Sequence, residues 1–74
     1  MALIENFERE NLRKPKVDKP VHRATYSIDT IDGTTFLKIR TFGAANRLYE
    51  YDPSQIIQLG PEAIEQLKLI LAEV

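Results

Sequence analysis

The sequence predicts an α+β fold in which a four-stranded antiparallel β-meander is followed by one C-terminal α-helix. Three observations carry this prediction. Apolar and polar residues alternate from Val21 onward, and this period of two is typical of half-buried strands. The Asp32-Gly33 pair interrupts the alternation, as expected for a tight hairpin turn. Beyond Pro61, apolar residues recur at steps of three and four, which is the spacing of an amphipathic helix.

Four strands are expected in chain order. Both central positions of a type I′ hairpin turn need a positive φ, which Asp tolerates and Gly accepts freely, so the first two strands should pair around Asp32-Gly33. The small residues at 43–46 and the segment at 52–54 are expected to form the remaining turns. The expected strands cover residues 21–29, 35–41, 47–51 and 55–59.

The end of the chain is expected to be a helix that starts at Pro61. Gly60 stands at the cap, proline is pre-set for the first helical position, and Glu62 places a negative charge at the positive end of the helix dipole. Leu69 falls outside the apolar stripe, so it should be exposed unless a second subunit covers it. The stripe itself consists of Ile64, Leu67, Ile70, Leu71 and Val74.

The chain is long enough for one domain only. We expect residues 21–74 to form the β-β-β-β-α domain. Residues 1–20 should be a flexible or partly helical N-terminal arm, because Pro15, Pro20 and several charges interrupt its short apolar stripe. With no cysteine and one histidine, neither a disulfide nor a zinc site is expected. Domains of this size are marginally stable, so we expect a homodimer.

No set of residues able to carry out catalysis is recognisable, and we do not expect an enzyme. His22 has no cysteine or serine nucleophile pattern around it, and the three glycines form no phosphate-binding loop. We therefore expect no cofactor, no metal ion and no small-molecule substrate. The N-terminus does not resemble a signal peptide and no apolar run has membrane-spanning length, so a cytoplasmic protein that binds no membrane is expected.

The net charge of −1 hides a strong asymmetry along the chain. Residues 13–47 carry a net charge of +5, whereas residues 1–12 carry −2 and residues 48–74 carry −4. A basic centre between acidic ends favours a polyanionic partner.

The second expected strand predicts a sheet face that is both basic and aromatic. Leu37 and Ile39 point to one side of this strand. One helix can cover only one face of the sheet, and burying Lys38 and Arg40 without partners is costly, so the helix should cover the Leu37 side. The face that the helix leaves bare then carries Phe36, Lys38, Arg40 and Phe42.

The third expected strand repeats this arrangement, because Leu48 points away from its neighbours Arg47, Tyr49 and Tyr51. Three interpretations of the bare face remain. Single-stranded nucleic acid would stack its bases on the rings and bind its phosphates to the cations. A protein interface is also rich in Tyr, Phe and Arg, and rings that pair across strands also stabilise a sheet without any ligand. Duplex DNA is not expected, because the sequence has no recognition-helix pattern.

Three segments resemble the positive cofactor four family of transcriptional coactivators. Residues 37–42 read Leu-Lys-Ile-Arg-Thr-Phe, similar to the Ile-Arg-aromatic strand of that family. Residues 54–62 read Ser-Gln-Ile-Ile-Gln-Leu-Gly-Pro-Glu, similar to its Ile-Ser-Leu-type strand and Pro-Glu helix start, and Leu67-Lys68 resembles its Leu-Lys pair. The resemblance covers residues 21–74.

The resemblance implies a homodimer of curved sheets that binds single-stranded or melted DNA, with the C-terminal helices in the dimer contact. Carried over by position, Lys38, Arg40 and Phe42 would lie on the nucleic-acid side. The chain departs from the family at residues 52–55, which replace a Gly-Lys-rich turn, and at Ile64, which stands where tryptophan is usual. The dimer interface is expected at Leu67, Leu69, Ile70 and Val74.

We therefore expect a single-stranded nucleic-acid-binding protein that serves as an accessory factor in transcription or DNA processing. The alternative is a small protein-interaction module, an inhibitor or a subunit, that uses the same aromatic-basic face. The residues expected to bind nucleic acid are Phe36, Lys38, Arg40, Phe42, Arg47, Tyr49 and Tyr51.

Overall fold

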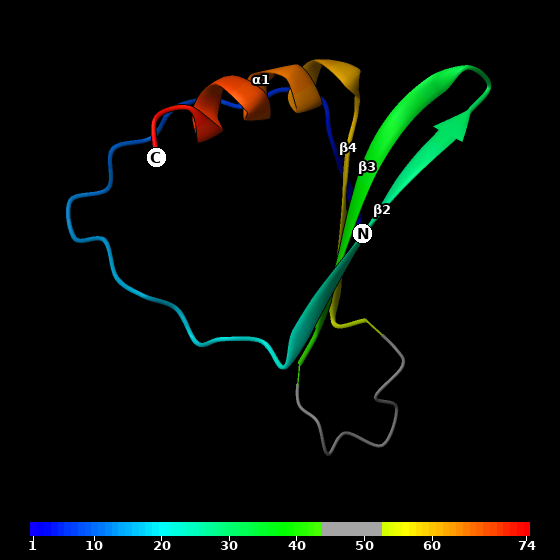
Figure 1. The fold of residues 1–74 in the computed structure, drawn as a ribbon. Coiled ribbons are helices and arrows are strands. Elements are labelled where there is room, and N and C mark those ends of the chain that lie inside the picture. The colour runs from blue at the N-terminus through cyan, green and yellow to red at the C-terminus, as the bar shows by residue number, and fades with distance from the viewer. Residues whose placement is uncertain (44–52) are drawn as a thin grey trace.

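The computed structural model describes residues 1–43 and 53–74. Its elements form a small α+β fold, with a four-stranded sheet and a helix at the C-terminal end (Figure 1). The elements are β1 (Ala2–Ile4), β2 (Arg23–Ile31), β3 (Thr34–Phe42), β4 (Gln55–Leu59) and α1 (Pro61–Leu71).

The β2–β3 hairpin confirms the turn predicted at Asp32-Gly33. Asp32 has φ 52° and Gly33 has φ 79°, so both central residues take the positive φ that a two-residue hairpin needs. The pairing starts at Ile31 and Thr34 next to the turn and continues in antiparallel register to Arg23 and Phe42. The turn therefore fixes the partner of every residue in the longest two strands.

The sheet is mixed, so the prediction of a purely antiparallel meander is wrong. Its strand order is β1-β4-β3-β2, in which β4 pairs antiparallel with β3 and β1 pairs parallel with β4. β1 comes from the N-terminal arm. Its apolar residues Ala2, Leu3 and Ile4 pair with the edge of β4. The strand expected at 47–51 lies outside the described residues.

The start of the arm is attached to the helix, and residues 5–22 contain neither helix nor strand. The Phe7 amide donates a hydrogen bond to Gln66 Oε1 (2.7 Å), and Gln66 Nε2 donates one to Asn6 Oδ1 (2.8 Å). Arg9 forms an ion pair with Glu73 (2.8 Å). The start of the predicted arm therefore forms a strand over Ala2–Ile4 and contacts α1 through Asn6, Phe7 and Arg9.

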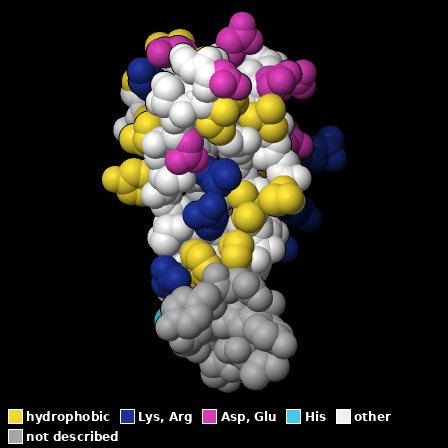
Figure 2. Space-filling model, turned by 90° about the vertical axis from the view of Figure 1, so that its right-hand side faces the viewer, with side chains coloured by type: hydrophobic (Ala, Val, Ile, Leu, Met, Phe, Trp, Pro, Cys, Tyr) yellow, Lys and Arg dark blue, Asp and Glu magenta, His cyan; other side chains and the backbone are white. Residues whose placement is uncertain are grey.

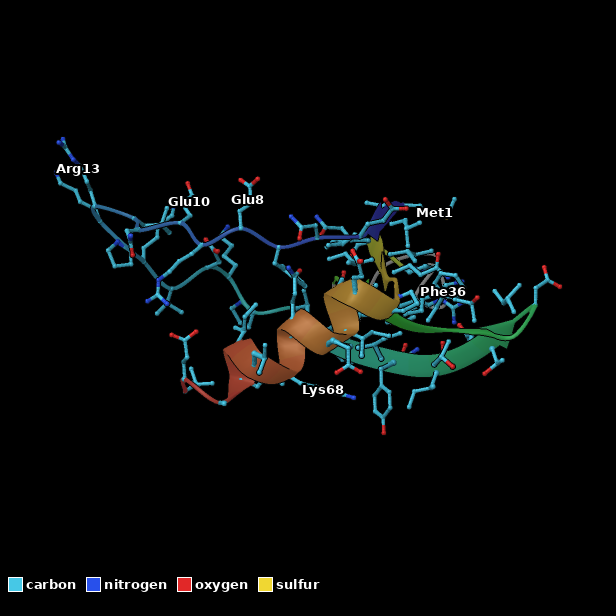
Figure 3. The ribbon with its side chains drawn as sticks, turned by 90° about the horizontal axis from the view of Figure 1, so that it is seen from above. Met1, Glu8, Glu10, Arg13, Phe36 and Lys68 are labelled. Carbon is cyan, nitrogen blue, oxygen red and sulfur yellow. The ribbon has the colours of Figure 1, made fainter. Side chains whose placement is uncertain are left out.

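Helix α1 packs against β3 and β4 on one face of the sheet, and its start confirms the expected signals: Gly60 at the cap, Pro61 in the first turn and Glu62 after it. Leu59 is 2 % exposed and Ala63 is fully buried where the helix meets the sheet. Phe36 lies on the opposite side of the sheet from α1 (Figure 3). Leu37 and Ile39 alternate with Phe36, so they lie on the helix side, as predicted.

The fold is open, and its core is small. Among the described residues only Phe42, Leu59 and Ala63 are buried apolar side chains. The radius of gyration is 14.5 Å, whereas a compact chain of this length has a value of about 11 Å. The accessible surface is 6689 Å², against about 4,700 Å² for a compact monomer of this mass. Much apolar surface therefore stays uncovered in one copy of the chain.

No helix in residues 1–43 or 53–74 is long and apolar enough to cross a membrane; α1 spans 11 residues.

Two glycine substitutions test the role of the hairpin turn. An alanine at Gly33 would have to adopt φ +79°, although no atom lies within 4 Å of the added methyl group. We expect Gly33→Ala to lower the free energy of unfolding by about 1 kcal/mol, as measured by urea denaturation. The matched control is Gly60→Ala, because Gly60 has φ −79° and its added methyl group meets only Ile4 O at 3.9 Å. Equal losses for both variants would contradict the account.

Candidate nucleic-acid interface

The sheet face away from α1 gathers side chains from all four strands, and we call it the open face. Its position follows from the register, because paired residues in a sheet point to the same side. The open face consists of Leu3 on β1, Arg23, Thr25, Ser27, Asp29 and Ile31 on β2, Thr34, Phe36, Lys38, Arg40 and Phe42 on β3, and Ile56 and Gln58 on β4.

Two cations occupy the centre of the open face. Lys38 and Arg40 lie on β3, which is paired on both sides, so their backbone is held firmly. Both residues are half-buried. Neither belongs to the two ion pairs of residues 1–43 and 53–74, which join Arg9 to Glu73 and Lys68 to Glu65. Figure 2 shows Lys and Arg side chains in the middle of this face, with hydrophobic side chains beside them.

Phe42 supports a third cation. Its ring is 7 % exposed, and the guanidinium carbon of Arg23 lies 4.0 Å from the ring centroid. This distance is that of a cation–π contact, which holds the guanidinium group over the ring. Phe42 was expected to offer its ring to a ligand, but this residue is buried and Arg23 lies over its ring. Phe42 therefore positions a cation, and Phe36 is the phenylalanine of the open face that remains available to a base.

Phe36 lies at the hairpin end of the open face and is half-buried. Its cross-strand partner is Asp29, whose Oδ2 accepts a hydrogen bond from Ser27 Oγ (3.2 Å). Lys38 is the next residue of β3 on this side, and the rise of a strand puts same-side neighbours about 6.7 Å apart. Along this side of β3, two cations therefore lie between two rings, in the order Phe36, Lys38, Arg40 and Phe42.

The structure brings together four of the predicted nucleic-acid residues, Phe36, Lys38, Arg40 and Phe42. The other three, Arg47, Tyr49 and Tyr51, lie outside the described residues. Sequence reasoning missed Arg23, Gln58 and Leu3. The position of Arg23 could have been predicted from the sequence, because extending the hairpin register from Asp32-Gly33 places Arg23 opposite Phe42. No sequence signal indicated Leu3, because a three-residue strand shows no period.

Three of the residues expected at a dimer interface lie on α1, and Val74 follows its end. Leu67 is half-buried, whereas Leu69, Ile70 and Val74 are exposed. The last turns of α1 extend beyond the sheet (Figure 1). On the same side of the sheet, Tyr26 and Ile28 of β2 are 74 % and 69 % exposed. The helix side therefore carries an uncovered apolar surface.

No group of three or more His, Cys, Asp or Glu residues that could hold a metal ion occurs in the part of the chain that the structure describes. No protein-family model matches the chain, and no curated protein or solved structure is significantly similar to it.

Proposed function

We propose that this chain binds single-stranded nucleic acid along the open face and serves as an accessory factor in transcription or DNA processing in the cytoplasm. One observation carries the proposal: Lys38 and Arg40 stand side by side on an interior strand, on the face without a helix, and no described carboxylate forms an ion pair with them. Two cations held in this way favour an anionic ligand.

The combination of cations and an aromatic ring on the open face suits a nucleic-acid strand. The cations Arg23, Lys38 and Arg40 bind phosphates, and the ring of Phe36 offers a stacking platform beside them. Stacking of a base on an aromatic side chain contributes about 1–3 kcal/mol, and it tolerates any base sequence. This combination of a basic track with an adjacent ring is the general design of sheets that bind single strands.

A duplex fits less well. Reading a major groove needs a helix or a two-stranded ribbon with exposed donors. The exposed charges of α1 are Glu62, Glu65 and Lys68, and Lys68 is paired with Glu65 at 3.1 Å. A helix with this charge pattern would repel the phosphates that flank a groove.

We also propose that a second copy covers the apolar surface on the helix side. Tyr26, Ile28 and Leu69 are 74 %, 69 % and 73 % exposed on the helix side, and a stable interface needs about 800 Å² from each partner. The occupant is a second copy because a chain of this size gains stability by self-association. The open face stays accessible in such a dimer.

The free edge of β2 favours a second candidate function, a small protein-interaction module that acts as an inhibitor or subunit. β2 is the last strand of the described sheet, and an unpaired edge can accept a strand from another protein. This function would show as a co-purifying protein together with no oligonucleotide binding at low salt.

The nucleic-acid proposal is tested by a salt series. Fluorescence anisotropy with a labelled single-stranded oligonucleotide should give a linear fall of log K with log salt. Lys38→Ala and Arg40→Ala should each lower the slope by about 0.7, because each variant loses one phosphate contact. The matched control is Lys68→Ala, which removes a cation from the outer side of α1. An equal loss of slope in Lys68→Ala, or no binding at low salt, would contradict the proposal.

The dimer is tested by the mass in solution from light scattering. The wild-type chain should have twice the monomer mass of 8.5 kDa. Leu69→Glu should give a monomer, because it puts a charge into the apolar contact. Leu12→Glu is the control, since Leu12 is also exposed but lies in the arm. A wild-type monomer at micromolar concentration would refute the second copy.

A further inference from the structure

A hollow on the open face lies where β1, β3 and the start of α1 meet. Its volume is about 380 Å³, and Leu3, Glu5, Phe36, Gly60, Pro61 and Glu62 line it. This volume is within the range of about 300–1,000 Å³ that small-molecule sites occupy. In Figure 2 the acidic side chains gather at this end of the face, next to hydrophobic ones and beyond the central cations.

The hollow depends on two features of the local structure. The first is β1, which places Leu3 beside Gln58, so that Leu3 lines the hollow together with Phe36. The second is Gly60, which contributes no side chain; an added methyl group there would meet only Ile4 O, at 3.9 Å. Gly60 is held in place by its amide, which donates a hydrogen bond to Ile4 O (3.0 Å). The hollow is therefore built jointly by the N-terminal strand and the helix cap.

We propose that this hollow receives one base of the bound strand and prefers bases that carry an exocyclic amino group. The inference rests on the proposed function, because it concerns the same open face. The base stacks on Phe36, with Leu3 on its other side, while its phosphate lies toward Lys38, the next residue of β3 on this face. The carboxylates of Glu5 and Glu62 accept hydrogen bonds from the base edge.

The chemistry of the carboxylates decides the preference. An ionised carboxylate only accepts hydrogen bonds, so it pairs with the N4 amino group of cytosine or the N6 amino group of adenine. Thymine and uracil present the O4 carbonyl at that position, and two acceptors facing each other repel. The same carboxylates repel phosphates, so the backbone is directed to the cations and the base to the hollow.

Binding to oligodeoxycytidine and oligodeoxyuridine of equal length tests the inference, because the two pyrimidines stack alike and differ at the base edge. We expect the wild-type chain to bind the cytosine strand about tenfold more tightly, in the range that one good base-edge contact supplies. Glu62→Gln should reduce the ratio of the two affinities severalfold, because the amide can also donate to a carbonyl. Phe36→Ala should weaken binding of both strands.

Glu65→Gln is the matched control. This substitution removes the same charge from a residue one turn after Glu62 on α1. Glu65 does not line the hollow and is paired with Lys68. It should raise both affinities slightly and leave their ratio unchanged. Equal wild-type affinity for the two strands, with a normal salt slope, would overturn the proposal that the hollow receives a base. The proposed function would still stand. No binding of either strand at low salt overturns both.

Discussion

The backbone conformation of Asp32 and Gly33 determines how the two faces of the sheet are composed. Their positive φ angles close a two-residue turn, and a turn of this length allows one register only. A shift of β2 against β3 by one residue would move Arg23 away from Phe42 and put the alternating residues of β2 on the opposite side. The cation above Phe42 and the pairing of Ser27 with Lys38 follow from this one constraint.

The position of α1 follows from the same arrangement. One short helix covers only part of a sheet, and the desolvation of Lys38 and Arg40 would be costly, so it lies against Leu37 and Ile39 instead. The aliphatic stems of the cations rest on the sheet while their charged ends reach water. Over the described residues, the result is a two-sided molecule: a basic face on which Phe36 is the available ring, and a helix side with exposed apolar residues.

Most of the fold could be predicted from the sequence, since strong periodicity indicated β2, β3 and α1. The Asp32-Gly33 pair indicated the turn between β2 and β3. β1 was missed because three residues carry no period and its partner β4 lies more than 50 residues away. The basic centre of the site was predicted from alternation alone. The burial of Phe42 was not, because the pattern within one strand does not show what covers a side chain. The hollow at Gly60 could not be predicted either, because β1 supplies one of its lining residues, Leu3, and β1 itself was missed.

The most direct test of the central claim is chemical-shift mapping of the isotope-labelled protein during titration with a single-stranded oligonucleotide. Binding along the open face should shift the signals of Lys38, Arg40 and the Arg23 guanidinium group, and should leave the outer side of α1 around Glu65 unchanged. Shifts confined to the basic arm at residues 13–19, with Lys38 and Arg40 unaffected, would contradict the account.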